Sequence, residues 1–167
     1  NSDTGGNIHN DGDSPQISFV NTVVANPGSG GNCVNPSGSL NSLGHNLEST
    51  NSCSFSATGD MVNTDPLLGP LQDNGGPTET HALLSGSPAI NAGDPAARGG
   101  VGDVPRWDQR GVPFGRVFDD QIDIGAFEVQ SEPFLAADFD EDGDVDGDGF
   151  LVWQTGFPVL SGAVHSD

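Results

Sequence analysis

Hydrophobic residues occur in short runs separated by polar segments rich in glycine, asparagine and serine. The clearest run, residues 17–24, is rich in β-branched residues and predicts a strand. Residues 121–128 alternate apolar and polar positions, which predicts another strand with every second side chain from Ile122 to Ala126 facing inward. Five prolines within residues 61–95 exclude a long helix or a regular central strand there. The pattern therefore predicts a mainly β protein with an irregular middle segment.

A shift of twenty residues superimposes similar residues in the first third of the chain. It places Val20 on Leu40, Asn21 on Asn41, Thr22 on Ser42, Val23 on Leu43, Asn26 on Asn46 and Cys33 on Cys53. A repeat of this length is typical of a solenoid in which each repeat forms one coil. Chance similarity within a stretch of low complexity is the alternative interpretation.

The two cysteines follow the same offset. Equivalent positions on successive coils of a β-solenoid lie one strand spacing apart, about 4.8 Å, which is within the Cα separation that a disulfide tolerates. We therefore predict a disulfide between Cys33 and Cys53, and with it an oxidising compartment. Two free buried thiols in a reducing compartment are the alternative. Two cysteines without further spaced ligands are a poor zinc signature.

The charge balance excludes some classes of partner. The 167 residues contain 24 Asp and Glu against 4 Arg and no Lys, which gives a net charge of −20. Such a chain lacks the basic surface needed to bind nucleic acid or an anionic membrane. No apolar run has the length of a transmembrane segment. Because the chain starts at Asn1 without a leader, we expect it to be part of a longer protein.

The middle of the chain resembles the choice-of-anchor Q domain of bacterial surface proteins, over about residues 17–129. The motifs that carry the resemblance are Asp65-Pro66-Leu67-Leu68-Gly69, Asp73-Asn74-Gly75-Gly76-Pro77-Thr78, His81-Ala82-Leu83-Leu84, Ser87-Pro88-Ala89-Ile90-Asn91-Ala92-Gly93, Asp108-Gln109-Arg110-Gly111 and Asp123-Ile124-Gly125-Ala126-Phe127-Glu128. The resemblance implies a secreted or cell-surface right-handed parallel β-helix, with its last coils in residues 1–60 and a C-terminal cap in residues 61–130. It implies no catalytic residue. Arg110 is expected to pair with Asp108 or Asp123 inside the cap.

An acidic segment near the end of the chain has the spacing of a calcium loop. Seven carboxylates fall within residues 138–148. Loop positions 1, 3, 5, 7 and 9 of an EF-hand-type site are occupied, with glycine at position 6 and a further aspartate just before position 12. The predicted Ca²⁺ ligands are Asp138, Asp140, Asp142, Asp144, Asp146 and Asp148. Gly149 stands at position 12, where a bidentate carboxylate belongs, so the affinity is in question. A solvated acidic linker is the alternative interpretation.

The loop and the short amphipathic helix expected at residues 150–157 together resemble one half of a type I dockerin. We assign residues 131–137 to a linker and residues 138–167 to a truncated dockerin-like repeat. This resemblance implies Ca²⁺ as cofactor and a cohesin-like or cell-surface partner for the tail. Polysaccharide is a second candidate partner.

Motifs for catalysis are missing from the sequence. The four histidines lie far apart, few acidic residues precede residue 61, and no Lys or Arg precedes Arg98. We therefore expect an extracellular or cell-surface protein with a structural or adhesive role, rather than an enzyme. The alternative is the non-catalytic end of a polysaccharide-degrading lyase or hydrolase whose active coils lie upstream.

Overall fold

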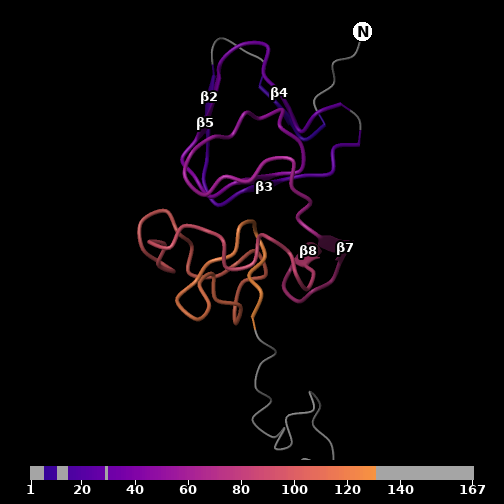
Figure 1. The fold of residues 1–167 in the computed structure, drawn as a ribbon. Coiled ribbons are helices and arrows are strands. Elements are labelled where there is room, and N and C mark those ends of the chain that lie inside the picture. The colour runs from indigo at the N-terminus through magenta and orange to yellow at the C-terminus, as the bar shows by residue number, and fades with distance from the viewer. Residues whose placement is uncertain (1–5, 11–14, 29, 131–167) are drawn as a thin grey trace, which may run out of the picture. The chain divides into compact units, whose positions relative to one another are not determined.

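The computed structural model describes residues 6–10, 15–28 and 30–130 (Figure 1). These residues contain eight short strands and no helix. The strands are β1 (Ile8–His9), β2 (Gln16–Phe19), β3 (Val23–Val24), β4 (Cys33–Val34), β5 (Ser39–Ser42), β6 (Leu47–Glu48), β7 (Leu68–Gln72) and β8 (Thr80–Leu83).

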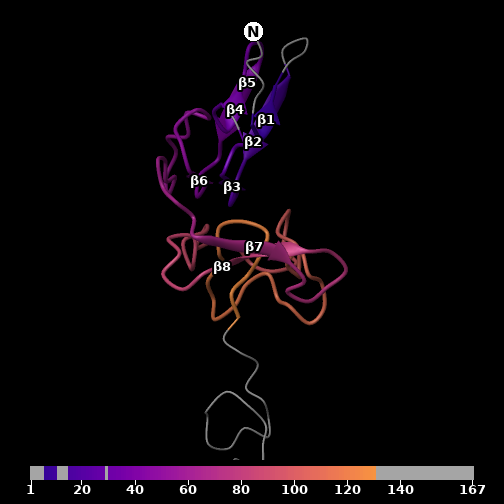
Figure 2. The same cartoon turned by 90° about the vertical axis from the view of Figure 1, so that its right-hand side faces the viewer.

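The first six strands form three parallel pairs, β1 with β4, β2 with β5 and β3 with β6. Figures 1 and 2 both show β2 beside β5. The paired residues are Ile8 with Cys33, Gln16 with Ser39 and Val23 with Leu47, which are offsets of 25, 23 and 24 residues. The predicted offset of twenty is therefore wrong for the strands. It arose from aligning residue types, whereas the turns between the strands set the register.

The predicted β-helix is corrected by the sheet topology. Each of the four sheets in the described residues has only two strands, and none continues as a solenoid sheet. Beyond β6, the parallel pairing continues only as an isolated bridge between Leu47 and Met61. The described part of the chain is a small mainly β fold. After β6 the described chain supplies no further strand in parallel register, so each of these sheets ends at two strands.

The predicted strand at residues 17–24 is divided into β2 and β3 by a corner. Asn21 has a φ of 48° and His45, which occupies the matching corner before β6, has a φ of 54°. Asparagine is among the residues that tolerate this left-handed conformation. The Asn46 amide bonds the corner, since its Oδ1 accepts from the Thr22 N–H and its Nδ2 donates to the Phe19 carbonyl. A polar side chain thus satisfies the backbone where the strand turns.

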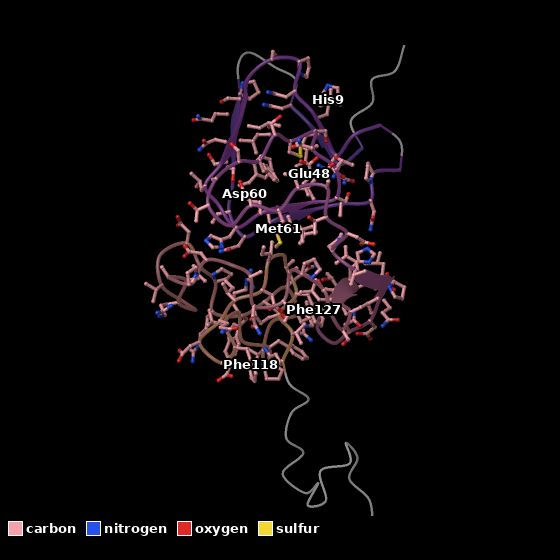
Figure 3. All side chains as sticks on the ribbon, viewed as in Figure 1. His9, Glu48, Asp60, Met61, Phe118 and Phe127 are labelled. Atoms are coloured by element: carbon pink, nitrogen blue, oxygen red, sulfur yellow. A yellow bond between two sulfur atoms is a disulfide. The ribbon has the colours of Figure 1, made fainter. Side chains whose placement is uncertain are left out.

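Two hydrophobic clusters lie on opposite faces of β3 and β6. The first consists of Phe19, Val24, Cys33, Cys53 and Phe55, with the rings of Phe19 and Phe55 5.1 Å apart. The second consists of Leu47, Leu83, Ala89 and Ile124, with Val23, Met61 and Phe127 packed against it. Neighbouring residues of a strand point to opposite faces, so Val24 enters the first cluster and Val23 the second. Met61 and Phe127, which pack against the second cluster, are labelled in Figure 3.

Two further predictions about residues 61–130, which we call the cap, need correction. The proline-rich segment contains an antiparallel pair, β7 with β8, although Pro70 lies within β7. Pro70 is exposed, and the register shifts between Leu68 and Leu71, which is where a sheet tolerates proline. Residues 121–128 form no strand. Ile122 and Ile124 are buried as predicted, but Ala126 is exposed.

The chain divides into two units, and the one that the structure describes ends at Val129. All the strands described above belong to the first unit. Within the residues that the structure describes, there is no helical segment of the length and hydrophobicity that a membrane span needs.

Candidate functional site

A disulfide bond joins two buried positions of the first cluster. Cys33 in β4 and Cys53 in the loop after β6 have Cα atoms 5.0 Å apart. Both pack with Phe19, Val24 and Phe55. No cysteine in the described residues is free. The bond therefore fixes the loop after β6 to a strand that precedes it by 20 residues.

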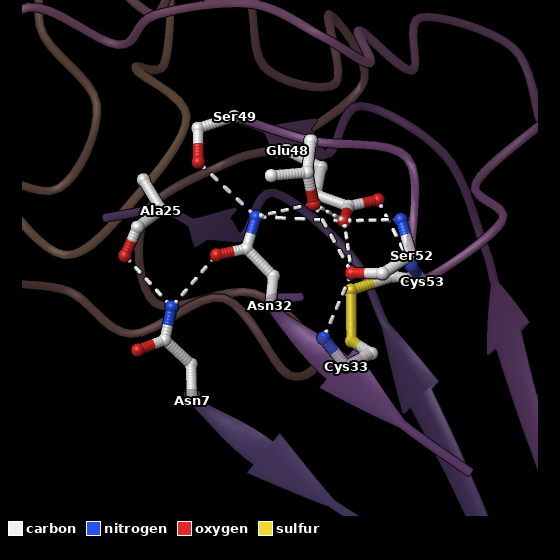
Figure 4. The surroundings of a disulfide bond; sticks show 9 residues. Asn7, Ala25, Asn32, Cys33, Glu48, Ser49, Ser52 and Cys53 are labelled. Atoms are coloured by element: carbon white, nitrogen blue, oxygen red, sulfur yellow. Dashed lines mark hydrogen bonds between the residues drawn. A yellow bond between two sulfur atoms is a disulfide. The ribbon is translucent and has the colours of Figure 1, made fainter. Parts of the chain in front are cut away.

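The carboxylate of Glu48 holds the same loop from inside (Figure 4). Its Oε1 accepts hydrogen bonds from the Thr50 hydroxyl at 2.6 Å, the Ser52 N–H at 2.7 Å and the Ser52 hydroxyl at 2.8 Å. Its Oε2 accepts from the Cys53 N–H at 3.0 Å, and Asn32 Nδ2 lies 3.4 Å from Oε1. Glu48 thus organises the backbone that presents Cys53.

The environment of Glu48 keeps this carboxylate ionised. Burial acts to raise its pKa, but the hydrogen bonds from Thr50, Ser52 and Cys53 together outweigh burial and lower the pKa below its usual value. Hydrogen bonds to the charged form are the expected cause of such a shift. An ionised, fully bonded carboxylate with no exposed surface does not act as a general acid. Glu48 is therefore a structural residue.

Asp60 plays a comparable part at the next turn. Its Oδ1 accepts from the Asn46 N–H at 2.9 Å, while Oδ2 accepts from the Ser42 hydroxyl at 2.6 Å and the Ala57 N–H at 2.7 Å. These bonds tie the end of β5, the start of β6 and the loop around residue 57 to one side chain. Figure 3 shows Glu48 and Asp60 in the part of the chain that contains β1–β6.

Two arginines and three acidic residues form a buried cluster in the cap, which we call the cap ion cluster. Its members are Asp108, Arg110, Arg116, Asp123 and Glu128, each 6% exposed or less. Arg110 pairs with Asp108 through NH2 and Oδ2 at 2.7 Å and donates from NH2 to the Glu128 carbonyl at 2.6 Å. Of the two predicted partners of Arg110, the structure selects Asp108.

Arg116 holds the other side of this cluster. Its NH1 donates to Glu128 Oε2 at 2.6 Å, and its NH2 donates to the carbonyls of Asp123 and Gly125. Asp123 in turn accepts from the N–H groups of Asn91 and Val129. These contacts fix residues 123–129 as an ordered loop without a sheet. Glu128 Oε1 is a buried oxygen with no hydrogen-bond partner among the described residues.

Burial changes the acidity of two members of the cap ion cluster. Burial raises the pKa of Glu128 to about 7, and the negative charge of Asp123 acts in the same direction. The hydrogen bond from the Asp123 N–H and the charge of Arg116 act to lower this pKa, but they do not outweigh burial. Burial also raises the pKa of Asp123 against hydrogen bonds from Asn91 and Val129. A shifted carboxyl is a candidate general acid only where substrate reaches it. Glu128 is 0% exposed and does not line the groove described below.

Arg110 also binds two aromatic rings. Its guanidinium carbon lies 3.8 Å from the ring centroid of Phe114 and 3.8 Å from that of Phe127. A planar guanidinium stacks on aromatic faces in a way that a lysine ammonium does not. Phe127 thereby couples the cap ion cluster to the second hydrophobic cluster.

A groove of about 860 Å³ lies between residues 21–26 and the cap. Leu83, Ile124 and Phe127 contribute apolar surface, and Thr80, His81 and Gln109 contribute polar groups. His81 also contacts the Gly69 carbonyl through Nδ1 at 2.7 Å. None of the residues that line this groove is a carboxylate or a cysteine.

The six predicted calcium ligands lie outside the described residues, as do the expected helix at 150–157 and the dockerin-like repeat. Over the described ranges, no group of three or more His, Cys, Asp or Glu side chains could hold a metal ion. Of the other histidines, His45 contacts the Ala92 carbonyl through Nδ1 at 3.1 Å.

The sequence did not single out Glu48, Arg116 or Glu128. A signal is present for Glu48. It is followed by hydroxyl residues at positions 50 and 52 and then by Cys53, which suits a carboxylate that binds its own loop. The burial of Arg116 and Glu128 has no comparable signal, because the sequence does not distinguish Arg116 from the exposed Arg98 and Arg106.

The chain was compared with protein-family models, curated proteins and solved structures, and none of them matched.

Proposed function

We propose that this chain is a structural or adhesive module of a secreted or cell-surface protein. The observation that carries the proposal is the Cys33–Cys53 disulfide, buried in a hydrophobic cluster and supported by Glu48. Persistent structural disulfides belong to oxidising compartments. The carboxylates at Glu48, Asp60 and Asp108 all bond to backbone or to arginine, which is the arrangement of a scaffold rather than of a catalytic centre.

The disulfide is tested by export of the chain to an oxidising compartment. The non-reduced protein should be lighter than its reduced form by the mass of two hydrogen atoms. The double substitution Cys33→Ala with Cys53→Ala should lower the free energy of unfolding by about 3 kcal/mol, from closure of a loop of about 20 residues. Two free thiols after export would contradict an extracellular role. Ser52→Ala serves as a control that alters the same loop without opening the crosslink.

We further propose that the acidic segment at residues 138–148 binds Ca²⁺ and serves for attachment to a cohesin-like or cell-surface partner. The support is the spacing of its carboxylates, which alternates through nine loop positions around Gly143. Oxygen ligands of this kind favour Ca²⁺ over softer metals.

Calorimetric titration of Ca²⁺ into chelator-treated protein tests the calcium site. We expect one saturable site with a dissociation constant of about 10⁻⁴–10⁻³ M, the range of extracellular modules. Asp142→Ala should remove it, whereas Asp103→Ala, which removes an exposed acid in the cap, should leave it unchanged. Heat that does not depend on Asp142 would identify the segment as an acidic linker.

A further inference from the structure

The turn between β7 and β8, residues 73–79, contains the only Asn-Gly pair of the sequence, Asn74-Gly75. An asparagine side chain can react with the main-chain nitrogen of the residue that follows it. Glycine hinders this attack least, because it has no Cβ. Asn74 and Gly75 are both partly exposed, so water reaches them. The neighbouring side chains decide whether the fold assists the reaction.

The nitrogen that would attack is bonded to a carboxylate. The Gly75 N–H donates to Asp73 Oδ1 at 2.9 Å, which is within the reach of a general base. The Asp73 side chain is exposed, so a proton that it takes from the nitrogen has a route to solvent. Asp73 is therefore placed to activate the Gly75 nitrogen.

The carbon that would be attacked, Asn74 Cγ, is polarised by a neighbouring amide. Gln72 Nε2 donates to Asn74 Oδ1 at 3.0 Å. Negative charge develops on this oxygen when a nitrogen adds to Cγ, and a donor at about 2.7–3.1 Å stabilises such charge. Asn74 Nδ2 in turn donates to the Thr80 carbonyl at 2.8 Å and to the Thr80 hydroxyl at 3.1 Å. The hydroxyl thus lies beside the nitrogen that would leave.

We propose that Asn74-Gly75 is a self-modification site, at which Asn74 is converted through a cyclic succinimide into aspartate and isoaspartate. The Gly75 nitrogen gives its proton to Asp73 and forms a bond to Asn74 Cγ. The bond from Cγ to Nδ2 then breaks, its electron pair stays on the nitrogen, and the nitrogen takes up a proton and leaves as ammonia. Water, the only other reactant, opens the ring at either of its two carbonyl carbons. This proposal goes beyond the proposed function and depends on neither the disulfide nor the calcium segment.

The products do not fit the contacts of this turn. The amide of Asn74 donates twice to Thr80, whereas a carboxylate donates no hydrogen bond and brings a negative charge against the Thr80 carbonyl. Isoaspartate also adds one carbon to the main chain. The turn has no room for it, because even a Cβ on Gly76 would overlap the main chain of Arg110. We therefore expect the modification to release the turn from Arg110.

Peptide mapping by mass spectrometry of the full chain, incubated at pH 8, tests the reaction. We expect the peptide that contains Asn74 to lose the mass of ammonia and then to gain the mass of water, with aspartate and isoaspartate as products. The same incubation in denaturant gives the rate of the unfolded chain, in which the groups around Asn74 are dispersed. The native protein should react at least as fast as the unfolded chain.

Two variants test the roles of the neighbouring side chains. Asp73→Ser keeps an oxygen that can accept from the Gly75 N–H but has no carboxylate. Gln72→Ala removes the donor to Asn74 Oδ1. Each should slow the reaction at least fivefold. Glu79→Gln is the matched control, because it removes an exposed carboxylate from the same turn and should leave the rate unchanged.

Limited digestion with trypsin tests the structural consequence. Anion exchange separates modified from unmodified protein, because the modification adds one negative charge. Cleavage after Arg110, whose main chain packs against the turn, should be at least fivefold faster in the modified protein. Cleavage after the exposed Arg98 should be unchanged.

The proposal is overturned if Asn74 reacts more slowly in the native protein than in the unfolded chain, since the fold would then protect this pair. Acceleration by Asp73→Ser would also overturn it, because the carboxylate would then restrain the turn rather than take a proton. Equal slowing by Glu79→Gln and Asp73→Ser would attribute the effect to net charge and refute the role of Asp73. Equal cleavage after Arg110 in both forms would refute the release of the turn.

Discussion

The replacement Glu128→Gln should change how stability depends on pH. The folded protein raises the pKa of Glu128 from 4.5 to about 7. A carboxyl with a raised pKa in the fold binds its proton more tightly there than in the unfolded chain. Its contribution therefore favours folding at low pH and is lost as pH rises from about 4.5 through 7. Above that range, the buried carboxylate must be kept ionised with one oxygen unpartnered among the described residues.

The magnitude follows from the pKa difference at about 1.4 kcal/mol per pKa unit. Between pH 5 and pH 8, Glu128 should lower the free energy of unfolding by about 2–3 kcal/mol. Glutamine has the same shape and does not titrate. At pH 5 Glu128 is protonated, so glutamine resembles it closely and the two proteins should have similar stability. As pH rises to 8, the unmodified protein should lose about 2–3 kcal/mol of its free energy of unfolding relative to the variant, so the difference between the two proteins should widen in favour of the variant.

The assay is denaturant unfolding of both proteins at pH 5, 6, 7 and 8, followed by tryptophan fluorescence. Subtracting the two curves cancels every titrating group that they share. If the free energy of unfolding changes with pH in the same way for both proteins, the reasoning is refuted. That result would mean that Arg116, 2.6 Å from Glu128, holds the pKa of Glu128 at its ordinary value.

Two further substitutions test the core and the disulfide loop. Leu47→Ala should lower the free energy of unfolding by about 2–5 kcal/mol, because Leu47 is 0% exposed, whereas Leu43→Ala, at a residue 61% exposed, should change it by less than about 0.5 kcal/mol. Glu48→Gln should destabilise the protein at pH 7 by about 1–3 kcal/mol, since it weakens the bonds to the Ser52 and Cys53 N–H groups. The pKa of Glu48 is lowered in the fold, so its contribution is present above pH 4.5 and lost as pH falls below it, and unfolding curves between pH 3 and pH 7 should converge at the acid end.

The sequence predicted the features that depend on residue type and local pattern. Strand structure within residues 17–24, the burial of Ile122 and Ile124, and an acidic partner for Arg110 at either Asp108 or Asp123 all follow from hydrophobicity and charge at neighbouring positions. Such features need no knowledge of how distant segments meet.

Register could not be predicted in this way. Asparagine, serine and small aliphatic residues recur so often that an offset of twenty aligns as well as the observed 23–25. The difference is set by corners such as Asn21 and His45, whose positive φ values a residue pattern does not reveal. The β-helix prediction rested on that offset and on a family resemblance, so it was open to the same error.

The cap ion cluster was also beyond the sequence pattern. Residues 121–128 alternate apolar and polar residue types as a strand does, yet Ile122, Asp123 and Ile124 are buried in succession. The structure replaces the ladder with bonds from Arg116 to the carbonyls of Asp123 and Gly125. The observed loop differs from the expected strand in that it buries the polar residues Asp123 and Glu128. Burial depends on the tertiary structure, so the sequence pattern does not reveal it.

The division of neighbouring side chains between two clusters has a consequence for cooperativity. Val23 and Val24 are adjacent in β3, yet they pack in different clusters. In β6, Leu47 lies in the second cluster, while the carboxylate of its neighbour Glu48 bonds the N–H of Cys53 in the first. Neither cluster can lose its packing without disturbing a strand that the other needs. We therefore expect amide hydrogens in β3, β6 and β8 to exchange through one common opening reaction. The part of the chain that precedes the cap and the cap itself would then differ in sequence character, yet they would unfold together as one cooperative unit.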